Sequence, residues 1–353
     1  MRAIGIESGK TGPRLLEVPE PEPTSGEALV RTLRVGVDGT DHEVIAGNHG
    51  GPPEGDDHLV LGHEAVGVVE DSMDTRFERG DVVVPTVRRP PASGSNEYFE
   101  RGIADMAPPE ATVERGIDGA HGFMAEYFTS PADCLVGVPD ALAEWGFLVE
   151  PVSISEKALE LAYASRSSFD WQPETALVLG NGPLGLVTVA MLRPEFEVYC
   201  LGRRDRPDPS IQIIEQLGGT YVDSRETPVD EIPAAYEAVD LIYEATGYAK
   251  HAFESIDALA PAGVAALLGV PNSWTFEVDG GRLHQELVMQ NKALVGSVNS
   301  GRRHFESAVE TLGELPSSFL EAYVTTVAHY ESFEDAFETT NETIKTAVEF
   351  DSL

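Results

Sequence analysis

The stretch TALVLGNGPLG, residues 175–185, decides the fold of this chain of 353 residues. Its apolar first half is typical of a buried strand, and PLGLVTVAMLRP at 183–194 is typical of a helix. A G-x-G-x-x-G turn between a strand and a helix is the fingerprint of a dinucleotide-binding unit. The helix N-terminus offers free N–H groups and a positive dipole to the cofactor's phosphates. The turn therefore predicts dinucleotide contacts at Gly180, Asn181, Gly182, Pro183, Leu184 and Gly185.

Strands and helices alternate on both sides of this turn. We expect strands over the apolar runs at 197–202, 220–223, 240–247 and 263–270, and helices at 151–165, 210–219 and 251–263. Near-continuous apolar strands separated by helices indicate a parallel sheet that is covered on both faces. The fold class is therefore α/β, with a doubly wound parallel sheet in this part of the chain.

The end of the strand at 197–202 indicates which dinucleotide is preferred. An NAD enzyme usually places Asp or Glu there, to hold the ribose 2′-hydroxyl. This chain has Gly202 instead, followed by Arg203 and Arg204. Glycine removes the repulsion of a carboxylate, and guanidinium groups bind a phosphate in a bidentate manner. We predict that NADP is preferred over NAD, with Gly202, Arg203 and Arg204 among the contacts.

The first 150 residues have a different pattern. Short apolar or alternating runs at 28–37, 65–71, 81–87 and 133–139 are typical of strands, and proline and glycine separate them. Between the last two runs, residues 88–122 form a polar, proline-containing excursion that we expect to be an irregular loop. A β-rich domain therefore precedes the α/β domain, and the segment after 293 is expected to rejoin it.

Charge is the most unusual property of the composition. Sixty acidic residues against 24 basic ones give a formal net charge of -36, and only five residues are lysine. Like charges repel and favour expansion in dilute buffer, whereas molar salt shortens the Debye length to about 3 Å. The acids are spread over the whole chain, so an acidic tail does not explain them. We predict a halophilic protein, and such a surface excludes nucleic acid as a partner.

Compartment and cysteine use are unremarkable. The N-terminus has no apolar run of signal-peptide length, and no stretch has the length of a membrane span, so we expect a cytoplasmic protein without a membrane partner. The two cysteines, Cys134 and Cys200, lie in apolar stretches and are expected to be free thiols.

Four short motifs in the chain resemble a known family. They are DGTD at 38–41, GHE at 62–64, GNGPLG at 180–185 and EPVSISEKAL at 150–159. Together they resemble the zinc-dependent medium-chain alcohol and polyol dehydrogenases, and QNKALVGSVNSG at 290–301 narrows the resemblance to the archaeal glucose dehydrogenase branch. The resemblance implies a GroES-like catalytic domain, residues 1–152 and 293–353, around a Rossmann NADP-binding domain, residues 153–292.

The resemblance also implies a catalytic zinc ion with an open coordination position. Its ligands would be Asp38, His63, Glu150 and, in some states, Glu64, while Asp41 would orient His63. Asp38 stands where most of the family has a cysteine, and a carboxylate binds zinc less tightly than a thiolate does. The family's structural zinc lobe uses four cysteines, and residues 88–122 contain none, so we expect one zinc per subunit. A metal-free enzyme of the same superfamily remains an alternative.

The implied reaction is oxidation of D-glucose, or a related aldose, at C1 to the lactone, with hydride transfer to NADP and zinc acting as a Lewis acid. Thr40 would pass the proton outward. Residues at positions that contact the sugar or lie near the nicotinamide would be Thr40, Glu64, Glu114, Glu150, Asn291 and Asn299, with Asn291 assigned to the cofactor. Two alternatives stay open: a zinc dehydrogenase of another polyol such as sorbitol or xylose, and a non-catalytic NADPH-binding protein. The family forms dimers and tetramers, and a homodimer is favoured.

Overall fold

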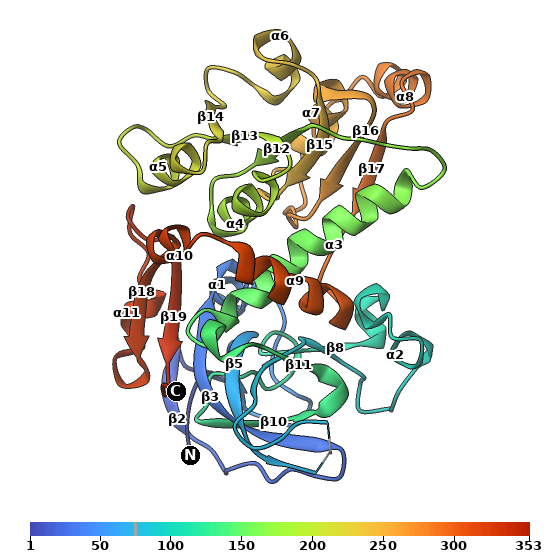
Figure 1. Ribbon diagram of the computed structural model, residues 1–353. Helices are drawn as coiled ribbons and strands as arrows, with labels where there is room; N and C mark the ends of the chain where they lie inside the picture. The colour runs from blue at the N-terminus through green and yellow to red at the C-terminus, as the bar shows by residue number, and fades with distance from the viewer. Residues whose placement is uncertain (74–75) are drawn as a thin grey trace. The chain divides into compact units, whose positions relative to one another are not determined.

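The computed structural model describes residues 1–73 and 76–353, which divide into two compact units (Figure 1). Unit 1 comprises residues 1–153, 299–314 and 324–353, and unit 2 comprises residues 154–298 and 315–323. The predicted return to the first domain at residue 293 differs from this division. The strand β17, Ala293–Gly296, pairs with the sheet of unit 2, so the chain re-enters unit 1 only at residue 299.

Unit 1 is built around a seven-stranded sheet whose strands follow the order β11-β6-β5-β3-β19-β18, with β10 also paired to β3. All pairs are antiparallel except β18 with β19. Its strands are β3 (Glu27–Val37), β5 (Glu64–Ser72), β6 (Val82–Pro85), β10 (Tyr127–Pro131), β11 (Leu135–Gly137), β18 (Val324–His329) and β19 (Lys345–Glu349). Alternating burial along β3 shows why it forms: valine and leucine side chains fill the core on one face.

Two small sheets and several helices complete unit 1. One sheet has the order β2-β1-β4 and the other the order β7-β8-β9. These strands are β1 (Arg2–Glu7), β2 (Arg14–Glu17), β4 (His58–Val60), β7 (Arg88–Arg89), β8 (Val113–Arg115) and β9 (Gly119–Ala120). The helices are α1 (Gly39–Ile45), α2 (Glu97–Glu100), α9 (Arg302–Glu314) and α11 (Glu334–Phe337). The excursion at 88–122, expected to be irregular, thus contains short paired strands.

Unit 2 contains the predicted parallel sheet, whose six strands have the order β14-β13-β12-β15-β16-β17. Its remaining strands are β12 (Thr175–Leu179), β13 (Glu197–Gly202), β14 (Thr220–Asp223), β15 (Val239–Glu244) and β16 (Leu259–Leu267). The chain runs outward from β12 in one direction and from β15 in the other. Right-handed crossovers in opposite directions place their helices on opposite faces, which makes the sheet doubly wound.

The helices of unit 2 are α4 (Pro183–Leu192), α5 (Pro209–Gln216), α6 (Ile232–Ala235), α7 (His251–Ala258), α8 (Gly280–Met289) and α10 (Ser317–Tyr323). The helix α3 (Val149–Ser165) begins in unit 1 and continues in unit 2. One prediction was wrong: the helix expected at 251–263 ends at Ala258, and β16 begins at Leu259 because Leu259 pairs with Val239. Among the described residues, no helix has the length and apolar character that crossing a membrane requires.

Candidate active site

The start of helix α1 fixes two of the predicted acidic residues. The Oδ1 atom of Asp38 accepts a hydrogen bond from the backbone N–H of Asp41 at 3.1 Å, and Oδ2 of Asp41 accepts one from the backbone N–H of Asp38 at 3.1 Å. This reciprocal capping satisfies donors that a helix N-terminus leaves free. The Thr40 hydroxyl donates to Oδ2 of Asp38 at 3.1 Å. The sequence DGTD therefore folds into a turn with both carboxylates fixed.

The His63 ring lies between these two carboxylates. Its Nε2 atom is 3.7 Å from Oδ2 of Asp38, and its Nδ1 atom is 3.9 Å from Oδ1 of Asp41. The preceding Gly62 has φ +85°, and a Cβ there would lie 2.5 Å from Cγ of Met124. Only glycine fits this backbone without strain, so Gly62 determines where the imidazole points. The predicted ligand and the predicted orienting residue therefore face opposite nitrogens of one ring.

Two further buried carboxylates, Glu64 and Glu150, face the same imidazole. Glu64 begins β5 opposite Gly36, and a Cβ at Gly36 would lie 2.0 Å from Oε2 of Glu64. The glycine thus leaves the space that the carboxylate occupies. Glu150 lies in the first turn of α3. His63, Glu64 and Glu150 offer ligand atoms that all lie within 4.8 Å of one another.

A buried lysine that the sequence analysis missed contacts this cluster. Lys345 begins β19 and is 1% exposed. Its Nζ atom makes an ion pair with Oε2 of Glu64 and donates to the carbonyl of Val37 at 3.1 Å. The available signal was a lysine at the head of the apolar run KTAVEF, in a chain with only five lysines.

The electrostatics of the cluster show an excess of negative charge. Burial raises the pKa of Glu150 to about 8 and the pKa of Asp41 to about 7, because desolvation disfavours the charged carboxylate. For His63, burial acts to lower the pKa, but the carboxylate of Asp38 outweighs it and the pKa is raised. Burial acts to raise the pKa of Asp38 as well, but the neighbouring His63 outweighs it and the pKa of Asp38 is lowered.

This donor set fits a divalent metal ion. Asp38, Asp41 and His63 form a second group whose ligand atoms lie within 4.8 Å of one another. The Nδ1 atom of His63 and the Oδ1 atom of Asp41 are buried without a hydrogen-bond partner, which is costly unless something else compensates. A dication would offset the excess charge, and a histidine with carboxylates is a donor set that zinc accepts.

The structure also brings Glu114 and Asn299 together within unit 1. The Nδ2 atom of Asn299 donates to Oε1 of Glu114 at 3.0 Å. Asn299 has φ +57°, a left-handed conformation that asparagine tolerates better than most residues. Arg88, which the sequence analysis did not identify, donates through Nε to the same oxygen at 2.9 Å. No sequence signal marked Arg88, since it lies in the excursion that was expected to be irregular.

The dinucleotide turn of unit 2 has the geometry that its sequence predicts. Gly180 has φ +114°, and a Cβ at Gly185 would lie 1.8 Å from the carbonyl oxygen of Gly180. Gly182 has open space where a side chain would be. A cavity of about 670 Å³ lies at the carboxyl ends of β12, β13 and β15, and its lining includes Gly180, Asn181, Gly182, Gly202, Arg203, Ser224, Arg225 and Thr246. Pro183 and Leu184 begin α4 beside it.

The two predicted phosphate-binding arginines differ in their surroundings. Arg203 lines the cavity, whereas Arg204 lies 3.7 Å through Nη1 from Asp208 and is not part of the lining. Arg225, which the sequence analysis missed, lines the cavity and is paired with Asp205 and Asp223. A Cβ at Gly202 would lie 2.4 Å from Oδ1 of Asn181, so this position has no room for a carboxylate.

Asn291, predicted as a cofactor contact, is not part of the lining of this cavity. It precedes β17 and lies exposed at the amino end of the parallel sheet. The dinucleotide turn lies at the opposite, carboxyl edge. Asn291 has φ +53° and serves the turn between α8 and β17.

Comparisons with known proteins show the family of this chain. The model of the alcohol dehydrogenase GroES-like domain matches residues 24–140, and the model of the glucose dehydrogenase C-terminus matches residues 143–350. The chain is 64% identical to the glucose 1-dehydrogenase of Haloferax mediterranei and 65% identical to glucose 1-dehydrogenase 1 of Haloterrigena turkmenica, with 100% of each chain covered. The chain belongs to the glucose dehydrogenase family.

A solved structure of a glucose dehydrogenase gives the same result in three dimensions. The Haloferax mediterranei glucose dehydrogenase in complex with NADP, Zn and gluconolactone is 64% identical and superposes with a TM-score of 0.98 over 100% of both chains. This match confirms the predicted α/β fold class, with a GroES-like part and a Rossmann part. It also confirms the resemblance drawn from the DGTD, GHE and GNGPLG motifs.

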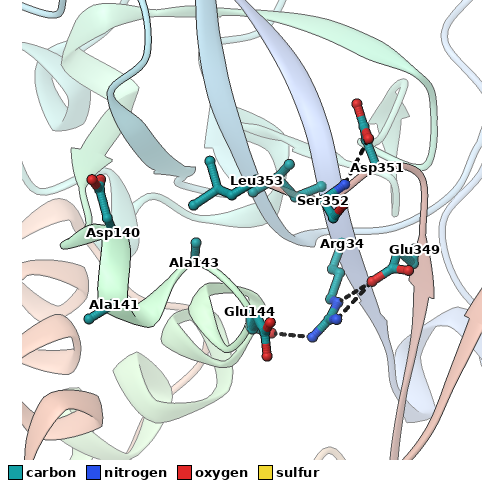
Figure 2. Close-up of a pocket in the computed structure, with 10 residues that line it drawn as sticks. Arg34, Asp140, Ala141, Ala143, Glu144, Glu349, Asp351, Ser352 and Leu353 are labelled. Atoms are coloured by element: carbon teal, nitrogen blue, oxygen red, sulfur yellow. Dashed lines mark hydrogen bonds and ion pairs between the residues drawn. The ribbon is translucent and has the colours of Figure 1, made fainter.

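The protein has a further cavity in unit 1, whose lining includes none of the metal-ligand candidates (Figure 2). Its volume is about 300 Å³, and its lining includes Asp140, Glu144, Glu349, Asp351 and the C-terminal Leu353. Arg34 pairs with Glu349 at 2.7 Å and donates to the carbonyl of Glu144 at 2.9 Å. The cavity is an acidic recess in which one arginine offsets part of the charge.

Proposed function

We propose that this protein oxidises D-glucose, or a related aldose, at C1 to the lactone and transfers the hydride to NADP. The observation that carries the proposal is the buried cluster of His63 with Asp38, Glu64 and Glu150, whose charge calls for a dication. Family membership supports it, since relatives of at least 64% identity are named glucose 1-dehydrogenases. The Haloferax mediterranei protein was solved with NADP, Zn and gluconolactone.

The metal site would use four residues of unit 1. Asp38, His63 and Glu150 would hold one zinc ion, and Glu64, which pairs with Lys345, would be a further ligand in some states. His63 is common to the two groups of candidate ligands, one with Asp38 and one with Glu64 and Glu150. When bound, zinc supplies a Lewis acid that lowers the pKa of a coordinated hydroxyl. The buried Nδ1 atom of His63, which has no hydrogen-bond partner, and the raised pKa of Glu150 support this assignment.

The remaining residues of unit 1 handle the sugar and its proton. Thr40, whose hydroxyl contacts Asp38, takes the proton of the anomeric hydroxyl and passes it outward. The C1–H bond breaks with its electron pair, which goes as hydride to the nicotinamide. Glu114 and Asn299 bind other hydroxyls, because a polyol needs groups that accept and donate hydrogen bonds.

Unit 2 would bind NADP in the cavity at the carboxyl ends of its strands. The turn at Gly180–Gly185 contacts the pyrophosphate, and Arg203 with Arg225 offers guanidinium groups for the 2′-phosphate. NAD is disfavoured, because no carboxylate stands at Gly202 to hold a free 2′-hydroxyl.

The proposal extends to assembly and location. We expect a homodimer in the cytoplasm. The described six-stranded sheet ends in two edge strands, β14 and β17, and we take β17 as the candidate subunit contact.

The test is a substrate panel in molar KCl. The purified protein is given NADP with D-glucose, other aldoses, sorbitol and simple alcohols, and both NADPH and the sugar product are quantified. We expect NADPH and lactone, or the acid formed from it, in equal amounts with glucose. Turnover of sorbitol or alcohols without any aldose would instead support a different polyol dehydrogenase. NADPH binding without turnover of any compound would support the binding-protein alternative.

A further inference from the structure

We propose that Arg88 is a positioning residue for the sugar site: it holds Glu114 so that one carboxylate oxygen stays free for a sugar hydroxyl. The inference rests on the proposed function, in which Glu114 and Asn299 contact the sugar. It adds a residue that no motif of the sequence identified.

The hydrogen bonds of Glu114 are divided unequally between its two oxygens. Oε1 accepts from Nε of Arg88 at 2.9 Å and from Nδ2 of Asn299 at 3.0 Å. Two donors occupy both lone pairs of that oxygen. Oε2 has no partner among the described residues, and it is not among the buried atoms. The carboxylate therefore presents one accepting oxygen in a fixed direction.

Strand pairing explains why Arg88 reaches this oxygen. Arg88 lies directly opposite Glu114 in the antiparallel pair β7–β8. Cross-strand partners have Cβ atoms about 4.5–5.5 Å apart, so oppositely charged side chains meet there without a change of backbone. The Arg88 side chain is 5% exposed and the Glu114 side chain is 18% exposed, so the contact is shielded from salt while Glu114 stays accessible.

The other end of the Arg88 guanidinium is tied to a second segment. Its Nη1 atom donates to the carbonyls of Asp105 at 3.1 Å and Ala107 at 2.8 Å. The Asp105 carboxylate in turn pairs with Arg303 at 3.4 Å, and a Cβ at Gly301 would lie 2.6 Å from its Oδ1. Residues 104–107 are thus held against the turn that follows Asn299. Arg88 links both sugar-binding side chains to one buried network.

The geometry requires arginine and not merely a positive charge. The guanidinium is planar and presents donors in several directions, so Nε and Nη1 serve Glu114 and the carbonyls at once. A lysine ammonium at this position would reach one of the two partners. Without Arg88, Glu114 would rotate and offer the sugar both oxygens in no fixed direction.

The experiment compares R88M and R88K with the parent in molar KCl. The matched control is R79M, which removes an arginine paired with Glu70 on the exposed surface. We expect R88M to raise the KM for D-glucose by roughly tenfold or more, since a buried charge-assisted hydrogen bond is lost. The kcat and the KM for NADP should stay within about threefold. R88K should recover only part of the loss, and R79M should behave as the parent does.

Two further measurements separate positioning from a purely structural role. The first is a double-mutant cycle with E114Q. Because Arg88 acts through Glu114, the KM of R88M/E114Q for D-glucose should be no higher than the KM of the more impaired single variant. Across monodeoxy glucose analogues, R88M should lose the discrimination at one hydroxyl only. Equal losses in kcat, NADP binding and thermal midpoint would overturn the proposal, as would an unchanged KM in R88M. A parent without glucose turnover would refute the proposed function itself, which is a different result.

Discussion

His63 shows how a few residues build a candidate metal site in this chain. Its two ring nitrogens face Asp38 at 3.7 Å and Asp41 at 3.9 Å, and the backbone conformation of Gly62, which only glycine fits, fixes the ring between them. The motif resemblance assigned Asp38, His63 and Glu150 to one site, although Asp38 and Glu150 lie more than 100 residues apart. The sequence analysis missed Lys345 and Arg88, because strand pairing brings their partners to them and no local spacing in the sequence reveals that pairing.

We predict that Asp41→Asn weakens zinc binding about 10–100-fold, as loss of an orienting carboxylate does at other sites. Asparagine can still cap helix α1, so the turn should survive while His63 loses its charged partner. Zinc titration of the apoprotein in molar KCl measures the change. Glu43→Gln, on the same helix and exposed, is the control. Unchanged affinity in Asp41→Asn would show that Asp41 does not orient the ligand.

At the scale of elements, the sequence predicted the parallel sheet of unit 2 closely and failed at one junction. The strands over 175–179, 197–202 and 220–223 lie where their apolar runs indicated. The run from 251 to 263 was read as one helix, although Pro261 disfavours a helical conformation at the residue before it. Residues from Leu259 onward form a strand because Leu259 pairs with Val239, and that pairing exists only in the assembled sheet.

The carboxyl end of β13 leads to a prediction on cofactor choice. Arg203→Ala should reduce the preference for NADP over NAD by roughly tenfold or more, because a hydrogen-bonded ion pair with the 2′-phosphate is lost. Arg204→Ala should change it little, since Arg204 lies outside the cavity lining and beside Asp208. The ratio of kcat/KM for the two cofactors measures both. If the double variant Arg203→Ala/Arg204→Ala kept its full preference for NADP, the assignment of this turn to the 2′-phosphate would be contradicted.

The carboxyl end of β15 leads to a prediction on pH. Burial acts to raise the pKa of Glu244, but hydrogen bonds with His251 and Thr246 outweigh it, and the pKa is lowered. A lowered folded pKa stabilises the protein above the unfolded value of about 4.3, and the contribution disappears as pH falls through the folded value. Glu244→Gln should therefore cost about 1–2 kcal/mol at neutral pH, and the difference from the parent should shrink below pH 4.

Chemical denaturation at several pH values in molar KCl measures this difference. Glu226→Gln, an exposed acid in the same unit, is the control and should show little change at any pH. A Glu244→Gln deficit that stays constant with pH would mean that the contact is steric and not electrostatic.

At the scale of the whole molecule, the net charge of -36 goes with a scarcity of lysine and with the burial of most of the lysines that remain. Three of the five lysines have buried side chains that donate to backbone carbonyls: Lys157 to Val298, Lys292 to Ile256 and Lys345 to Val37. Lysine is thus kept where the interior uses its ammonium group and is scarce at the surface. Composition predicted the acidic surface, but it could not predict which lysines are internal.

This charge predicts that stability depends on salt. The midpoint of thermal unfolding should fall steeply as KCl is diluted from molar to millimolar concentration, because repulsion among the carboxylates is then unscreened. Calorimetry or circular dichroism at constant pH measures it. Sucrose at matched water activity should not replace KCl, since it does not screen charge. A midpoint that is independent of KCl would contradict the halophilic reading of the composition.

The central claim is that a single zinc ion, held by Asp38, His63 and Glu150, makes this chain an NADP-dependent glucose dehydrogenase. Its most direct test follows NADPH formation from D-glucose in molar KCl before EDTA treatment, after it, and after zinc is restored, with the metal content measured at each step. The account predicts one zinc per subunit, activity that disappears with that zinc, and recovery when it returns. Full glucose activity in protein shown to be free of metal would contradict it.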